Sequence, residues 1–163
     1  MAELTTLESK LGEVVGLAMA AQEATEKVMK LPELEDDLAQ KLQRMNEEAV
    51  DAERRGTELA GNFEGKKTAI LEEARETKGK AKEMLQTYLD DEADALDGFE
   101  FLTMAEAGEV GHWSVLETLN QRARDAGIGK YVDWGLPIQQ RHLAEVTQAT
   151  TALASEKDPG EVE

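Results

Sequence analysis

The stretch from Phe99 to Leu119 places two polar side chains inside an apolar helical stripe, and it constrains the fold more than any other segment. At helical spacing one face of this stretch carries Leu102, Ala105, Glu109, His112, Leu116 and Leu119. Glu109 and His112 stand three residues apart, so both can reach the same point. An unpaired buried carboxylate is costly, so it needs a proton, a hydrogen bond or a cation. The Glu-x-x-His pair therefore predicts either metal ligands in a helical bundle or hydrogen bonds across a seam between helices.

Composition indicates a single all-α domain. The 163 residues include only three prolines and seven aromatic residues (two Trp, two Tyr and three Phe), and the chain is rich in Ala, Glu, Leu and Lys. We expect one helical domain over residues 1–155 and a frayed acidic tail over residues 156–163.

The charge and the absence of cysteine limit the classes of function. A formal charge of −17 argues against nucleic acid or an anionic membrane as a partner, and favours solubility or cation binding without showing either. No cysteine is present, which excludes disulfides, thiolate metal sites and cysteine nucleophiles. No long apolar run or signal-peptide pattern occurs, so we expect a cytoplasmic protein.

Five helices are predicted from apolar periodicity and capping patterns. They are residues 6–29, a helix opening near Pro32 and continuing past Ala52, residues 64–89, a helix capped by Asp97 and Glu100, and residues 128–154. Gly12 and Gly16 leave room for a close neighbour or a bound group. The third helix has a narrower stripe and is expected on the outside. Gly135 and Pro137 predict a kink in the last helix, or its restart at Pro137.

A turn near Asp125 should pair the last two helices as an antiparallel hairpin. Counting outward from it, we expect His112 and His142 to face each other across the hairpin, with further polar side chains nearby. Gln139 stands three residues before His142 and repeats the x-x-His spacing. The candidate metal ligands are Glu48, Glu106, Glu109, His112, Gln139, His142 and Glu145.

The block from Ala105 to Trp113 resembles the second-hairpin motif of the ferritin-like superfamily, most closely its small bacterial stress-associated bundle proteins. The resemblance implies an antiparallel four-helix bundle of helices 1, 2, 4 and 5, with helix 3 as a long crossover. It also implies an iron or manganese site at the bundle centre, and ferroxidase, peroxide-scavenging or iron-handling activity.

The sequence departs from that family's pattern in its ligand set. The family draws a Glu from helix 1, but residues 16–20 contain no acid. Glu48-Ala-Val-Asp51 replaces the expected Glu-x-x-His of helix 2, and Gln139 replaces an acid. A one-metal site on Glu109, His112 and His142, with or without Glu48, or a decayed site, fits these departures better than a two-metal site.

Three functions are consistent with the sequence. The first is a metal-binding ferritin-like protein, with iron handling or oxidative-stress defence as its role. The second is a non-catalytic structural or assembly bundle with a degenerate metal site, acting through its surface. The third is haem binding between two histidines, because nearby glycines and alanines are small enough to admit a flat group. A homo-oligomer is expected.

Overall fold

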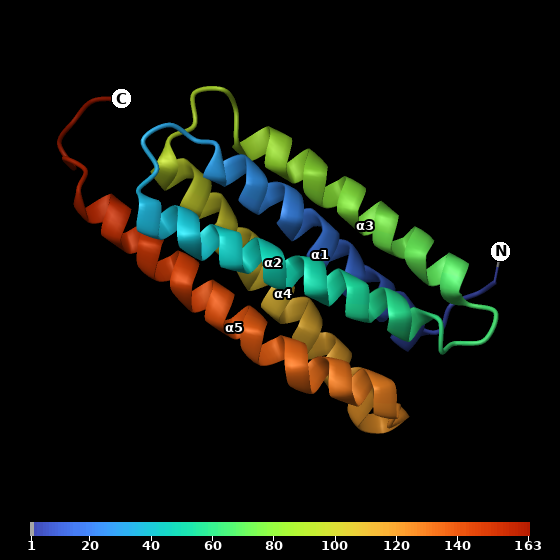
Figure 1. The fold of residues 1–163 in the computed structure, drawn as a ribbon. Coiled ribbons are helices and arrows are strands. Elements are labelled where there is room, and N and C mark those ends of the chain that lie inside the picture. The colour runs from blue at the N-terminus through green and yellow to red at the C-terminus, as the bar shows by residue number, and fades with distance from the viewer. Residues whose placement is uncertain (1) are drawn as a thin grey trace.

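The computed structural model describes residues 2–163 and shows a bundle of long helices (Figure 1). The prediction of an all-α fold is confirmed, because the described residues form helices, turns and bends without a strand. The five helices are α1 (Thr6–Met29), α2 (Asp36–Ala60), α3 (Lys67–Tyr88), α4 (Ala95–Ala123) and α5 (Ala126–Ser155).

The helices form two hairpins, and α3 lies between them in the chain. Helix α1 runs antiparallel to α2, and α4 runs antiparallel to α5 (Figure 1). Helix α3 returns along α1, so that α2 and α4 start at the same end of the bundle. Because α1 packs against α2, α3 and α4, it is the central element, while α3 packs mainly on α1 and lies on the outside as predicted.

Two apolar clusters fill the core. One surrounds Trp113 and Tyr131, and the other surrounds Phe99 and Leu102. On α4 and on α5, the residues of these clusters are separated by a short polar segment, which contains Glu106, Glu109, Gln139 and His142. The bundle is therefore apolar toward both ends and polar near the middle.

Helix boundaries differ from the predicted ones in several places. Helix α2 begins at Asp36, because the chain turns after Pro32 and Glu33 adopts a positive φ of 61°. Helix α4 begins at Ala95 with a capping box made by Asp94 and Asp97, so the predicted cap at Asp97 and Glu100 is wrong. The predicted restart at Pro137 is also wrong, since α5 continues through this residue.

Close packing of α1 against α3 depends on two glycines. A Cβ on Gly12 would lie 2.7 Å from the backbone oxygen of Ile70, and one on Gly16 would overlap the backbone oxygen of Ala74. Glycine permits this approach because it has no side chain. The space that the sequence predicts beside Gly12 and Gly16 is thus occupied by α3.

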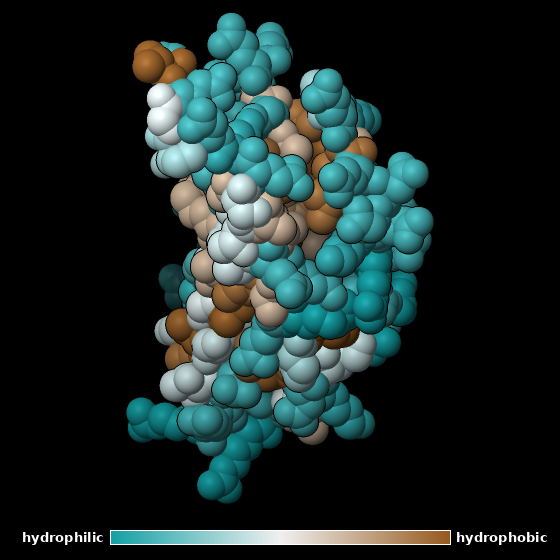
Figure 2. Space-filling model, turned by 90° about the vertical axis from the view of Figure 1, so that its left-hand side faces the viewer, coloured by the Kyte–Doolittle hydropathy of each residue, from teal (hydrophilic) through white to brown (hydrophobic). Residues whose placement is uncertain are grey.

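Hydrophilic residues cover much of the molecular surface. Figure 2 shows this for one end of the bundle, where hydrophobic residues appear as separate patches among hydrophilic ones. Among residues 2–163, no helix is long and apolar enough to span a membrane.

Candidate functional site

Two glutamates of α4 are buried at the middle of the bundle and share one amide partner. Glu106 and Glu109 stand three residues apart, and only 2% and 4% of their surfaces are exposed. We call them the acid pair. Gln139 of α5 is also buried, and its Nε2 donates hydrogen bonds to Glu106 Oε2 (3.1 Å) and to Glu109 Oε2. A single amide thus holds both carboxyl groups on the α5 side.

Burial makes the acid pair hold its protons unusually tightly. Removal from water raises the pKa of Glu106 to about 8, although the hydrogen bond from Gln139 works in the opposite direction. Burial also raises the pKa of Glu109 well above its usual range, and the neighbouring Glu106 charge adds to this effect. At neutral pH we therefore expect the acid pair to be mostly protonated.

A second group of polar side chains links α5 to α2 beside the acid pair. The Nδ1 atom of His142 lies 3.8 Å from Glu106 Oε2, and its Nε2 lies 3.2 Å from Glu48 Oε1. Arg141 donates a further hydrogen bond to Glu48. Burial raises the pKa of Glu48, but the hydrogen bonds from Arg141 and His142 outweigh it, so the net pKa is lowered. Burial lowers the pKa of His142 despite Glu48, so this imidazole is neutral at pH 7.

The predicted ligand Glu145 lies outside this cluster and contacts Arg141 instead. Its Oε1 is 3.8 Å from Arg141 Nη1. Within residues 2–163, Arg141 Nη1 and Glu145 Oε2 are buried side-chain atoms that form no hydrogen bond. Arg141 therefore bridges two acids, Glu48 closely and Glu145 loosely.

The prediction that His112 faces His142 is wrong. Helix α4 buries Glu106 and Trp113, whereas the side chain of His112 is 41% exposed. His142 lies beside Glu106, and His112 lies six residues farther along α4, which is about 9 Å by helical rise. The Nδ1 atom of His112 is 3.1 Å from Lys10 Nζ and 3.3 Å from Glu13 Oε2, both on α1.

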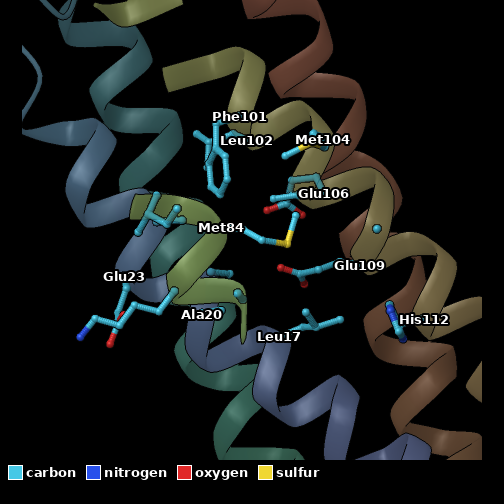
Figure 3. A pocket seen from close by; sticks show the side chains of 17 residues that line it. Leu17, Ala20, Glu23, Met84, Phe101, Leu102, Met104, Glu106, Glu109 and His112 are labelled. Carbon is cyan, nitrogen blue, oxygen red and sulfur yellow. The ribbon is translucent and has the colours of Figure 1, made fainter. Parts of the chain in front are cut away.

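A cavity of about 250 Å³ opens beside the acid pair, between α1, α3 and α4. We call it the groove. In Figure 3 the carboxyl groups of Glu106 and Glu109 point into it, and Met84 of α3 reaches toward them. Most of its lining is apolar: Leu17, Ala20, Ala21, Ala24, Ala81, Met84, Leu85, Phe101, Leu102, Met104, Ala105 and Gly108. Glu23, Lys82 and His112 also contribute to the lining.

Five of the seven predicted site residues come together, in a different arrangement from the predicted one. They are Glu48, Glu106, Glu109, Gln139 and His142. Sequence reasoning missed the groove, because its α3 wall depends on how α3 lies against α1. Gly108 is no specific signal for the groove, because a Cβ on Gly108 or on Gly111, which does not line the groove, would meet no other atom within 4 Å.

Comparison with known proteins assigns no family. No protein-family model, curated protein or solved structure matches the chain significantly. In the part of the chain that the structure describes, no group of three or more His, Asp or Glu residues is arranged to hold a metal ion.

Proposed function

We propose that this protein is a non-catalytic, ligand-binding bundle of ferritin-like topology, which takes up a small, mostly apolar molecule in the groove. The topology is supported by the order of the helices, in which α3 carries the chain back between two antiparallel hairpins (Figure 1). The binding role is supported by one observation above all: an apolar cavity contains two buried carboxyl groups that point into it (Figure 3).

The size of the groove limits the ligand. Pockets for drug-sized molecules have volumes of about 300–1,000 Å³, so 250 Å³ indicates a smaller compound. A six-carbon chain with one polar head group fits this space.

Binding in the groove can be tested with two glycines of α4. Gly108 lines the groove, whereas Gly111 does not, and a Cβ on either residue would meet no other atom within 4 Å. Both glycines are exposed in the middle of the same helix, so Gly108→Phe and Gly111→Phe are a matched pair. We expect amide shifts in NMR titrations with 1-hexanol, hexylamine and hexanoate to locate at least one probe in the groove. Gly108→Phe should weaken that binding at least about tenfold and Gly111→Phe should not.

The proposal fails if none of the three probes perturbs the amides of residues that line the groove. It also fails if both phenylalanine variants bind the probes as the wild type does, because the probes would then occupy another place. Circular dichroism spectra of both variants would show whether the bundle has kept its helical content.

The residues at the bundle centre do not fit the iron or manganese site that the ferritin-like resemblance implies. Glu48 is paired with Arg141, and the amide nitrogen of Gln139, which cannot ligate a cation, is directed at both carboxyl groups of the acid pair. His112 of α4 contacts Lys10 and Glu13 of α1 instead. We therefore derive no chemistry through a metal.

Metal binding, ferroxidase or peroxidase activity and homo-oligomer formation stay predictions of the sequence. Elemental analysis of untagged protein tests the first of these. Suppose that the protein contains about one atom of iron or manganese per chain and that Glu106→Gln/Glu109→Gln loses it. This result would contradict the proposal that an organic ligand occupies the site.

A further inference from the structure

The acid pair forms the floor of the groove, and no cationic side chain among residues 2–163 pairs with it at pH 7. Within residues 2–163, the only ion-pair contact of Glu106 or Glu109 within 4 Å is the one at 3.8 Å between Glu106 and His142, an imidazole that is neutral at pH 7. Gln139 supplies one hydrogen bond to each carboxyl group on the α5 side. On the other side, both carboxyl groups point into the groove (Figure 3).

The apolar walls of the groove favour a ligand that has a hydrocarbon part as well as a polar head group. Leu17 of α1, Met84 of α3 and Phe101 of α4 contribute side chains from all three helices. A hydrated metal ion on the floor would leave these apolar walls in contact with water. A ligand with an apolar body and a polar head can pack its body against the walls and place its head against the acid pair.

Charge favours a cationic head group over an anionic one. The chain has a formal charge of −17, which attracts cations and repels anions. An anionic head would also add its charge beside two acidic groups. An ammonium group that displaces their protons can instead donate hydrogen bonds to the resulting carboxylates, and such charge-assisted bonds are stronger than neutral ones.

We propose that the groove binds a small amphipathic primary amine, with its ammonium group on Glu106 and Glu109 and its hydrocarbon chain between α1, α3 and α4. This inference rests on the proposed function, since it names the class of ligand for the same site. No bond is made or broken, so the proposed role is reversible binding.

The test compares three probes with the same carbon chain and different head groups. Hexylamine, 1-hexanol and hexanoate are titrated into the full chain at pH 7.5, with amide chemical shifts as the readout. We expect hexylamine to bind at least about tenfold more tightly than hexanol, because its head group adds charge-assisted hydrogen bonds, and hexanoate to bind least tightly.

Substitution of the acid pair tests where the preference for the amine comes from. Glu106→Gln/Glu109→Gln keeps the shape of the floor and removes its ability to ionise. In this variant we expect hexylamine to lose at least about tenfold in affinity and hexanol to change less than about threefold. Glu100→Gln/Glu117→Gln is the control: it removes two negative charges from exposed positions of α4 that do not line the groove. It should leave the preference for hexylamine in place.

The outcomes separate the two proposals. If hexanol and hexylamine bind the wild type equally and Gly108→Phe blocks both, the groove is a binding site but the amine proposal is overturned. An amine preference that survives in the double glutamine variant also overturns it. If no probe binds in the groove, the proposed function itself fails.

Discussion

At the scale of single residues, the acid pair stores unfavourable free energy in the folded state. A carboxyl group ionises easily in water, but burial withdraws the water that stabilises its charge. Gln139 offsets part of this cost by donating to both groups. The remaining cost is removed most simply by a proton, and an ammonium group in the groove could take the proton's place.

The acid pair should make the free energy of unfolding fall as the pH rises. Glu106 has a pKa of about 8 in the folded protein against an ordinary value of 4.5, so between these values the unfolded chain has lost a proton that the folded chain retains. We expect a loss of about 1 kcal/mol between pH 7 and 8 from this residue, and a further loss from Glu109. Urea unfolding at pH 7.0, 7.5, 8.0 and 8.5 measures it.

Other titrating groups near the acid pair disturb this interval little. His142 has a lowered pKa in the folded protein and is neutral there above pH 7, and in the unfolded chain, at its ordinary value of 6.5, it is mostly neutral. Glu48 has a lowered pKa and is ionised in both states. Glu106→Gln/Glu109→Gln should flatten the pH dependence. Glu100→Gln/Glu117→Gln, which changes two exposed acids of the same helix, should keep it. A flat profile for the wild type would show that the acid pair ionises at ordinary pH.

The residues of the site were easier to predict from the sequence than their partners. Glu109 was found because an acid in an apolar stripe is unusual, and Glu106, Gln139 and His142 were found by spacing along two paired helices. The Glu48–Arg141 contact was not found, because it joins residues 93 positions apart on helices that are not consecutive. Nothing local in the sequence gives the distance between such helices.

At the scale of helices, the orientation of α4 explains the main error of the sequence analysis. The predicted stripe contains Ala105 and His112, whereas the structure buries Glu106 and Trp113, one position farther along. Burying the large Trp113 side chain gains more than burying an imidazole, since an aromatic ring removes much more apolar surface from water. Periodicity predicted that α4 is a helix and that Leu102, Glu109 and Leu116 are buried, but its rotation was wrong by less than the 100° that separates consecutive residues.

The contact between α1 and α3 should be sensitive to a single methyl group. Gly16→Ala would place a Cβ against the backbone oxygen of Ala74, which can move only with α3, and overpacking of this kind costs about 1–3 kcal/mol. We therefore expect thermal or urea unfolding to show destabilisation. The preference of helices for Ala over Gly offsets this by up to about 1 kcal/mol.

Gly79→Ala is the matched control for that substitution. Gly79 lies inside α3, and a Cβ there would meet no other atom within 4 Å. The control should thus show only the gain in helix propensity, a stabilisation of up to about 1 kcal/mol. Equal stabilisation by both alanine variants would mean that α3 does not lie as closely on α1 as the structure shows.

At the scale of the whole molecule, the helices differ in how firmly they are held. Helix α1 is packed by three neighbours, but α3 packs mainly on α1 and buries only Ala69, Ile70, Ala74 and Leu85 among its own residues. Segments with few buried apolar contacts open at a lower free energy than the rest of a protein. Helix α3 is also one wall of the groove, so its opening would give a ligand access to the acid pair.

Amide hydrogen exchange should therefore be faster in α3 than in α1 or α4. We expect α3 to become protected when a ligand occupies the groove, because the ligand adds apolar contacts to Met84 and Leu85. Exchange measured by mass spectrometry with and without hexylamine checks both statements. Uniform exchange across α1, α3 and α4 would show that the bundle opens as one unit.

The pairing of Arg141 with Glu48 has a consequence for the conditions under which the fold can form. An acid in the middle of a helical bundle can be neutralised by a dissolved cation, and folding then depends on the supply of that cation. Here the cation is a guanidinium group of the chain itself, carried on α5 to meet α2. The chain thus brings its own counter-ion to this position. We expect the charge of Glu48 to be neutralised equally well whether metal ions are scarce or abundant in the solution.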